Sequence, residues 1–165
     1  MATPDPRIET VSQALKAMTA LCDRGFALAV HIRLIRPTLL YQTYSAAWTD
    51  HYSVKGYMLT DPVVRWGLEQ NGSVKWSDLS DQDPAGVFKD AVAFGLTNGW
   101  THSVGPASSR TISGATKSGA DFTPEQRDEF CRLVDAIHVA TDGFEHFPAA
   151  VQDALKNLGH PGQGT

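Results

Sequence analysis

The sequence predicts an α/β fold, an α-β-α sandwich in which helices cover both faces of a central, mainly antiparallel five-stranded sheet. Segments at both ends of the chain carry apolar residues at helical spacing. Short runs rich in β-branched residues lie between these segments, and brief turns join some of the runs as antiparallel neighbours. With 165 residues, of which 42% are hydrophobic and 19% charged, the chain can bury one core, so we expect a single domain.

The first half of the chain begins with a helix and continues with two strands. Residues 26–35 form a strand that Pro37 terminates, and residues 38–43 can pair with it. Helices are then expected near 45–55, 62–70 and 84–97, with breaks at Gly72 and Gly99. The first helix ends before Gly25, and its apolar residues at helical spacing are Ile8, Val11, Ala14, Leu15, Met18 and Leu21.

The second half supplies the remaining strands and two further helices. Strands are predicted at residues 73–76, 100–104 and 110–117, and a turn-rich segment at 105–109 joins the last two. A helix begins at Thr123, which forms a capping box with Gln126. A last helix spans about 148–158. The buried face of the helix that follows Thr123 is expected to consist of Phe130, Leu133, Val134 and Ile137.

Charge, cysteine content and hydropathy exclude several classes of protein. A formal net charge of −4 and a pI near 5.8 argue against a nucleic-acid surface, which needs a concentrated Lys/Arg face. Cys22 and Cys131 form no CxxC pair, and neither a secretory leader nor an apolar run of about 18 residues occurs. We therefore expect a cytoplasmic chain that contacts neither membrane nor DNA itself and uses no cofactor or metal.

The most informative motif is an ordered series of aromatic and acidic residues. Tyr44, Trp48 and Tyr52 are four residues apart and would share one helix face, Asp61-Pro62-Val63-Val64 opens the next helix, and Trp76 follows. Such rings can enclose an apolar pocket while polar groups orient a ligand's head group. Two other interpretations stay open: the aromatic residues are ordinary core, and Asp61 is only a helix cap, as Asp83-Pro84 also suggests.

This series resembles the autoinducer-binding domain of LuxR-type quorum-sensing regulators, which are receptors for N-acyl-homoserine lactones. The resemblance runs from about Phe26 to Phe130 and includes Ala91, Phe94-Gly95-Leu96 and Gly99. It implies the same α-β-α fold, with one autoinducer-binding domain over residues 1–165, a core at about 8–158 and a tail or linker start at 159–165.

The resemblance also assigns roles to individual residues. It implies that Trp48 binds the lactone carbonyl, Asp61 the ligand's amide N–H, and Tyr44 the acyl carbonyl. These roles suit the chemistry of the ligand. Its head group has two carbonyl acceptors and one N–H donor, and the three side chains would supply two donors and one acceptor. Further positions that the resemblance places around the ring and acyl chain are Tyr52, Val64, Trp76, Val87, Phe88, Ala91 and Leu96.

The chain departs from the family pattern at several positions. Val87 is aliphatic where many members have an aromatic residue, and Ser103 replaces a proline. On the late strand, the direct register puts Ala115 where a Ser or Thr usually approaches the acyl carbonyl. Ser113 lies on the same face and could substitute, although a slip of one residue would invert that face. Acyl-chain specificity therefore stays open.

Three classes of function remain in competition. As a receptor, the chain is an excised sensor or a truncated regulator that homodimerises or pairs with a full-length partner. An enzyme acting on acylated lactones is the second class, but no G-x-S-x-G, HxxEH or HExxH motif occurs. An interaction module is the third, with Ala149, Ala150 and Ala154 permitting close helix approach. The receptor, a non-enzyme, is the interpretation we favour.

Overall fold

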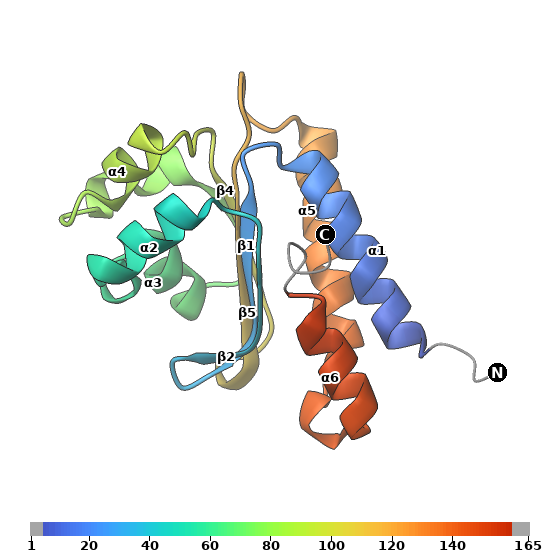
Figure 1. Cartoon of the computed structure of the whole chain (residues 1–165). Helices are drawn as coiled ribbons and strands as arrows, with labels where there is room; N and C mark the ends of the chain where they lie inside the picture. The colour runs from blue at the N-terminus through green and yellow to red at the C-terminus, as the bar shows by residue number, and fades with distance from the viewer. Residues whose placement is uncertain (1–4, 160–165) are drawn as a thin grey trace.

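The computed structural model describes residues 5–159 as a sheet between two layers of helices (Figure 1). The strands follow the order β2-β1-β5-β4-β3, and every neighbouring pair is antiparallel. The predicted five-stranded sandwich is therefore confirmed. Of the tail expected at 159–165, all but Gly159 lies outside the described residues.

The strands occupy nearly the predicted segments. They are β1 (Phe26–Arg33), β2 (Arg36–Gln42), β3 (Gly72–Lys75), β4 (Trp100–Val104) and β5 (Arg110–Ala115). The first strand stops two residues earlier than expected, because Leu34 takes a positive φ of 60° in the tight β1–β2 turn. β2 and β3 form the two edges of the sheet.

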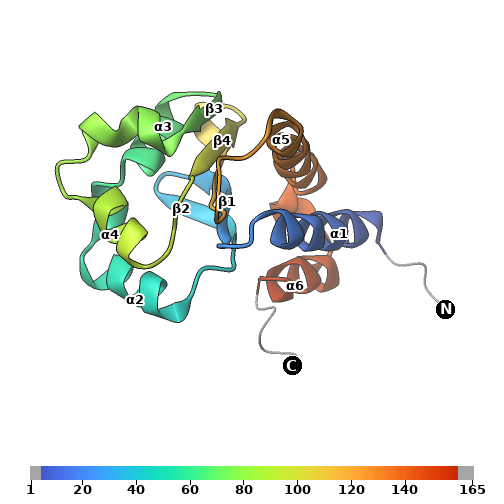
Figure 2. The ribbon, with the colours of Figure 1, turned by 90° about the horizontal axis from the view of Figure 1, so that it is seen from above.

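One face of the sheet packs on α1 (Pro6–Leu21), α5 (Pro124–Ala140) and α6 (Ala149–Asn157), as the view from above shows (Figure 2). The predicted Thr123–Gln126 capping box starts α5. We call this layer the back layer, and it contains the main apolar core. Its fully buried members include Val11, Met18, Phe26, Leu28, Val30, Phe130, Val134, Ile137 and Leu155.

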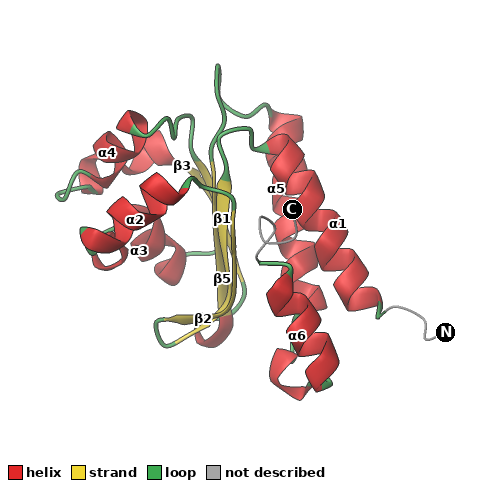
Figure 3. Cartoon of the chain, viewed as in Figure 1, coloured by secondary structure: helices red, strands yellow, loops and turns green. Residues whose placement is uncertain are grey.

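The opposite face carries a layer of shorter elements, which we call the front layer (Figure 3). It contains α2 (Ala46–Val54), α3 (Pro62–Glu69) and α4 (Val87–Ala93), with 3-10 turns at Tyr57–Leu59 and Trp76–Gln82. Its buried apolar residues form two small clusters instead of one continuous core. This division leaves space between the front layer and the sheet.

The helix expected at 84–97 is shorter in the structure. It begins at Val87, after Gly86 takes a left-handed conformation with φ 76°, and it ends at Ala93 before Gly95 with φ 83°. The Asp83 carboxylate accepts hydrogen bonds from the backbone N–H groups of Val87 and Phe88 at 2.8 Å each. Asp83 thus stabilises the start of the helix from a turn, without being its N-cap residue.

The remaining helices agree with the sequence to within one or two residues at each end, and further 3-10 turns lie at Ala107–Ser109 and Phe144–His146. Among the described residues, no helix is long and apolar enough to cross a membrane.

Candidate functional site

A cavity of about 490 Å³ lies between the sheet and the front layer. Its walls are mostly apolar, and its volume falls in the range of small-molecule sites. Ten of the residues expected around a ligand line this cavity: Tyr44, Trp48, Tyr52, Asp61, Val64, Trp76, Val87, Phe88, Ala91 and Ser113.

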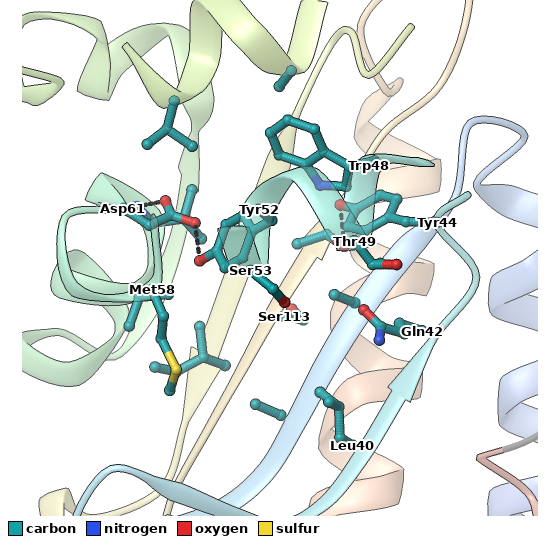
Figure 4. Close-up of a pocket in the computed structure, with 18 of the residues that line it drawn as sticks. Leu40, Gln42, Tyr44, Trp48, Thr49, Tyr52, Ser53, Met58, Asp61 and Ser113 are labelled. Carbon is teal, nitrogen blue, oxygen red and sulfur yellow. Dashed lines mark hydrogen bonds between the residues drawn. The ribbon is translucent and has the colours of Figure 1, made fainter. Parts of the chain in front are cut away.

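Asp61 is the acidic group of the cavity, and its carboxylate is held by the ends of two helices. One oxygen accepts the backbone N–H of Val63 at 2.8 Å, so Asp61 is also the N-cap of α3. The other oxygen accepts the phenol O–H of Tyr52 at 2.8 Å (Figure 4). Asp61 is therefore a helix cap and also lines the cavity, while its role in binding a ligand stays a prediction.

Burial raises the pKa of the Asp61 carboxyl, although the hydrogen bonds from Tyr52 and Val63 oppose this shift. An ionised carboxylate can accept more than the two bonds recorded here. Asp61 thus keeps acceptor capacity toward the cavity, and a further N–H donor would stabilise its charged form.

Trp48 contributes a hydrogen-bond donor to the wall of the same cavity. The α2 helix places Trp48 and Tyr52 on the cavity wall, as their spacing predicts, whereas Tyr44 lines the cavity from the residue before the Ser45 N-cap and not from the helix. The Trp48 side chain is buried and packs edge-on against Tyr52, with ring centroids 5.8 Å apart. Among the described residues, the indole N–H of Trp48 makes no hydrogen bond, so it is available to an acceptor in the cavity.

Tyr44 lies between α2 and β5, with its hydroxyl donating to the Gly114 carbonyl at 3.3 Å. Burial raises the pKa of this phenol, which therefore stays a neutral donor. A Cβ at position 114 would lie 3.6 Å from the Tyr44 hydroxyl and 3.3 Å from Trp76 Cζ2. Gly114 therefore forms part of the cavity wall, and the absence of its side chain enlarges the space beside Tyr44.

On β5, Ala115 does not lie at the cavity, which is where the direct register of the family pattern would put it. Ala115 packs in the core of the back layer, so it does not face the cavity. The Ser113 hydroxyl donates to the His102 carbonyl at 2.7 Å and accepts the His102 N–H at 3.2 Å. Ser113 as a ligand for an acyl carbonyl stays a prediction, and it would require the hydroxyl to leave this backbone.

Trp76 and Phe88 close one end of the cavity by stacking, with ring centroids 5.4 Å apart. The Trp76 indole N–H donates to Thr101 Oγ1 at 2.9 Å, so this ring is fixed. Gly99 permits the arrangement, because a Cβ there would lie 1.9 Å from Trp76 Cδ2. Leu96 is buried with Trp48 and Ala91 but is not among the residues that line the cavity.

Comparison with known protein families assigns this chain to a family. The family model described as "Autoinducer binding domain" matches residues 8–141, which is most of the chain. This chain belongs to the autoinducer-binding domain family. The relatives and solved structures that resemble this chain include transcriptional activator proteins and a LuxR family transcription factor.

Two curated relatives of this autoinducer-binding domain are transcriptional activator proteins named SolR. The SolR of Ralstonia nicotianae is 29% identical over 75 residues, covering 45% of this chain and 32% of that protein. The SolR of Ralstonia solanacearum is 33% identical over 60 residues, covering 36% of this chain and 25% of that protein. The match thus spans less than a third of each relative's length.

Solved structures share the fold of this autoinducer-binding domain. Escherichia coli SdiA superposes with a TM-score of 0.64 at 23% identity, over 88% of this chain and 63% of SdiA. CepR2 of Burkholderia cenocepacia, described as an N-acylhomoserine lactone dependent LuxR family transcription factor, superposes with a TM-score of 0.59 at 16% identity, over 91% of this chain and 96% of CepR2.

Sequence reasoning missed the part of the cavity wall that the sheet and the α2–α3 connection supply. Leu40 and Met58 line the cavity and are nearly half exposed, so the cavity reaches the surface between β2 and the turn after α2. Alternation along β1 and β2 could have indicated some of these positions. The missed lining residues are Ala27, Ala29, Ile32, Pro37, Leu40, Gln42, Thr49, Ser53, Gly56, Met58, Val63, Ile112 and Gly114.

Proposed function

We propose that this domain binds an N-acyl-homoserine lactone in the cavity, as the sensor of a LuxR-type regulator. The observation that carries the proposal is that one mostly apolar cavity is lined both by Asp61, whose carboxylate can accept further hydrogen bonds beyond those from Val63 and Tyr52, and by Trp48, whose indole N–H makes no hydrogen bond among the described residues. Ordinary core packing does not explain a carboxylate whose pKa burial raises.

The polar groups match the head of such a ligand. The amide N–H of the ligand would donate to Asp61, its lactone carbonyl would accept from Trp48, and its acyl carbonyl would accept from Tyr44. A hydrogen bond to a charged group contributes roughly 1.5–3 kcal/mol, and a neutral bond about 1 kcal/mol. The head group would therefore decide orientation, with Asp61 as the strongest single contact.

The apolar walls suit the acyl chain, which would extend from Tyr44 along the sheet toward Leu40 and Met58. Each buried methylene contributes about 0.8 kcal/mol, or roughly a factor of four in affinity. SdiA, which shares this fold, has been solved in complex with octanoyl-rac-glycerol, a molecule with a medium-length acyl chain on a polar head. A chain of similar length is our expectation here.

The regulatory role is proposed from the family. CepR2 is described as lactone dependent, and the SolR relatives are transcriptional activators. We propose that ligand binding in this domain acts in the cytoplasm, through a homodimer or through pairing with a full-length regulator. Mass spectrometry of the ligand after incubation with the protein would distinguish the two classes. A receptor releases the lactone unchanged, whereas an enzyme would hydrolyse it.

The test is the melting temperature of the ligand-free domain against acyl-homoserine lactones of graded chain length. At a hundredfold excess over Kd, a ligand adds roughly 2.7 kcal/mol, which is a shift of several degrees in a domain of this size. The shift should peak at one chain length and be lost in Asp61→Ala. Asp50→Ala is the matched control, because Asp50 is exposed on α2 and does not line the cavity. Absence of any shift would reject the proposal.

A further inference from the structure

A second group of reactive side chains lies on the far side of the sheet from the cavity, between the β3 edge and α5. Ser73 Oγ lies 2.8 Å from His102 Nδ1 and 3.2 Å from Cys131 Sγ. His102 Nε2 lies 2.8 Å from Asp135 Oδ1. The four side chains form one continuous hydrogen-bonded chain, Cys131–Ser73–His102–Asp135, which we call the thiol relay.

The thiol relay provides a path for a proton from sulfur to imidazole. Ser73 can accept the thiol proton and donate its own to His102 Nδ1, while Asp135 accepts Nε2–H and stabilises the resulting imidazolium. This arrangement parallels nucleophile–base–carboxylate groupings in which a base activates a Cys or Ser. The product of the transfer is a thiolate on Cys131 opposite a charged His102.

The surroundings favour the thiolate. Burial opposes ionisation of Cys131, but hydrogen bonds with His102 and Ser73 hold the pKa of the thiol below its ordinary value. Burial also opposes charge on His102, whose pKa is nevertheless raised by Cys131 and Asp135. The indole N–H of Trp100 also lowers the pKa of the Cys131 thiol.

The other cysteine has the opposite environment. Cys22 is 3% exposed, packs in the core of the back layer, and burial raises the pKa of its thiol to about 12. Cys131 is partly exposed, and Ser73 beside it lies on an exposed edge strand. The chain therefore contains one accessible, activated thiol and one inert thiol.

We propose that Cys131 is a modification site that undergoes exchange with low-molecular-weight disulfides. The thiolate attacks one sulfur of the disulfide, a new S–S bond forms to Cys131, and the original S–S bond breaks. The second half leaves as a thiolate and takes the proton that His102 holds. Cys131 is oxidised to a mixed disulfide and the leaving half is reduced to a free thiol, so atoms and electrons balance.

Oxidised glutathione is the probe, and intact-mass spectrometry of the native protein counts the adducts over pH 6 to 9. At pH 6.5 we expect one adduct, on Cys131, forming at least about fivefold faster than on an unfolded peptide that contains the same cysteine. Cys22→Ser should behave as wild type, Cys131→Ser should not react, and a dithiol reductant should restore the original mass.

Two variants test the thiol relay itself. His102→Gln and Ser73→Ala should each move the apparent pKa of the reaction toward that of the peptide and lower the rate at pH 6.5 several-fold. Ser73 is exposed, so its variant keeps the test valid if the buried His102 variant fails to fold, which circular dichroism would reveal. The inference is overturned if Cys131 reacts no faster than the peptide, or if Ser73→Ala leaves the pH profile unchanged.

Discussion

Asp61 combines two roles at the scale of a single residue, and the two roles have opposite effects on stability. Its carboxylate caps α3 and accepts from Tyr52, but burial raises the pKa of its carboxyl. When the folded pKa of an acid lies above the unfolded value near 3.9, the folded state binds more protons between the two values. Stability therefore falls as pH rises from about 4 through the folded pKa, and stays lower above it.

Asp61→Asn should relieve this penalty while it damages recognition. The amide can still cap α3 and carries no charge, so at pH 7 we expect the ligand-free melting temperature to rise by a few degrees. At pH 4 the difference should be smaller, because the raised pKa of the wild-type carboxyl increases its uncharged fraction as pH falls. Affinity for the lactone should fall at least about tenfold, since a charged acceptor is lost. Equal melting temperatures at pH 7 would show that the buried charge is already compensated.

Trp48→Phe distinguishes the contribution of the indole N–H as a hydrogen-bond donor from the contribution of the ring as part of the cavity wall. The ring that packs on Tyr52 is largely kept, but the indole N–H is removed, so affinity should fall by about 1–2 kcal/mol with a small change in melting temperature. Isothermal titration with one lactone measures this loss. Trp66→Phe is the control, because Trp66 packs in the front layer without lining the cavity. Equal losses in both variants would mean that packing, and not the N–H, matters at position 48.

The sequence predicted cavity-lining residues well where helical spacing determines their direction. Trp48 and Tyr52 share one face of α2, and Asp61 stands at the start of α3. The sequence was wrong to put Tyr44 on the same helix face, because Tyr44 precedes the Ser45 N-cap. It predicted them poorly on β5, where one step along the strand reverses the face and Gly114 has no side chain to reveal its role.

At the scale of elements, β5 limits the space in the cavity beside Tyr44, where the head group of the proposed ligand would lie. A methyl group at position 114 would contact Trp76 Cζ2 at 3.3 Å, and this ring is held by Thr101. Gly114→Ala should therefore weaken binding of every lactone by at least about tenfold, with a loss of stability of no more than about 1–2 kcal/mol. Titration and thermal melting of the same protein measure both effects, and unchanged affinity would place the ligand away from β5.

The contact between β1 and α5 should make stability depend on pH. His31 stacks on His138 at 4.2 Å, and His138 Nδ1 lies 2.6 Å from Thr111 Oγ1. Burial and the neighbouring His31 lower the pKa of His138, although Asp142 and Asp135 oppose this. The unfolded state then binds more protons, so stability is present above pH 6.5 and is lost as pH falls toward the folded pKa.

His138→Asn should reduce this loss, since the amide can retain the bond to Thr111 without titrating. Between pH 7 and 5 the urea-derived free energy of unfolding should fall less steeply in the variant than in the wild type. The difference in slope for one proton is at most about 1.4 kcal/mol per pH unit. Parallel curves would assign the pH dependence to other groups.

Strands and long helices followed from periodicity and caps, as the Thr123–Gln126 box at the start of α5 illustrates. The 3-10 turn at Trp76–Gln82 did not, because it carries no periodic apolar pattern. The helix at α4 was predicted too long, because Gly86 and Gly95 take positive φ at its ends. α4 depends on Asp83 and Gly86, whose roles become evident only when the backbone turn between them is known.

At the scale of the whole molecule, the two faces of the sheet differ in how they are stabilised. The back layer has one continuous core, whereas the front layer has two small clusters beside a cavity of about 490 Å³. The sequence predicted helices on both faces but not this asymmetry, since the size of a cavity depends on how elements pack and not on the pattern within any one of them.

The asymmetry should be visible in hydrogen exchange. Without ligand, amides of α2, α3 and α4 should exchange through partial openings at lower free energy than those of α1 and α5, because opening the front layer exposes less apolar surface. A lactone at a hundredfold excess over Kd should slow front-layer exchange by about a hundredfold, since each such opening destroys the site. Asp61→Ala with the same lactone should show no slowing. Equal protection of both layers without ligand would instead mean that contacts away from the cavity stabilise the front layer. The ligand would then bind a site that is rigid and already formed.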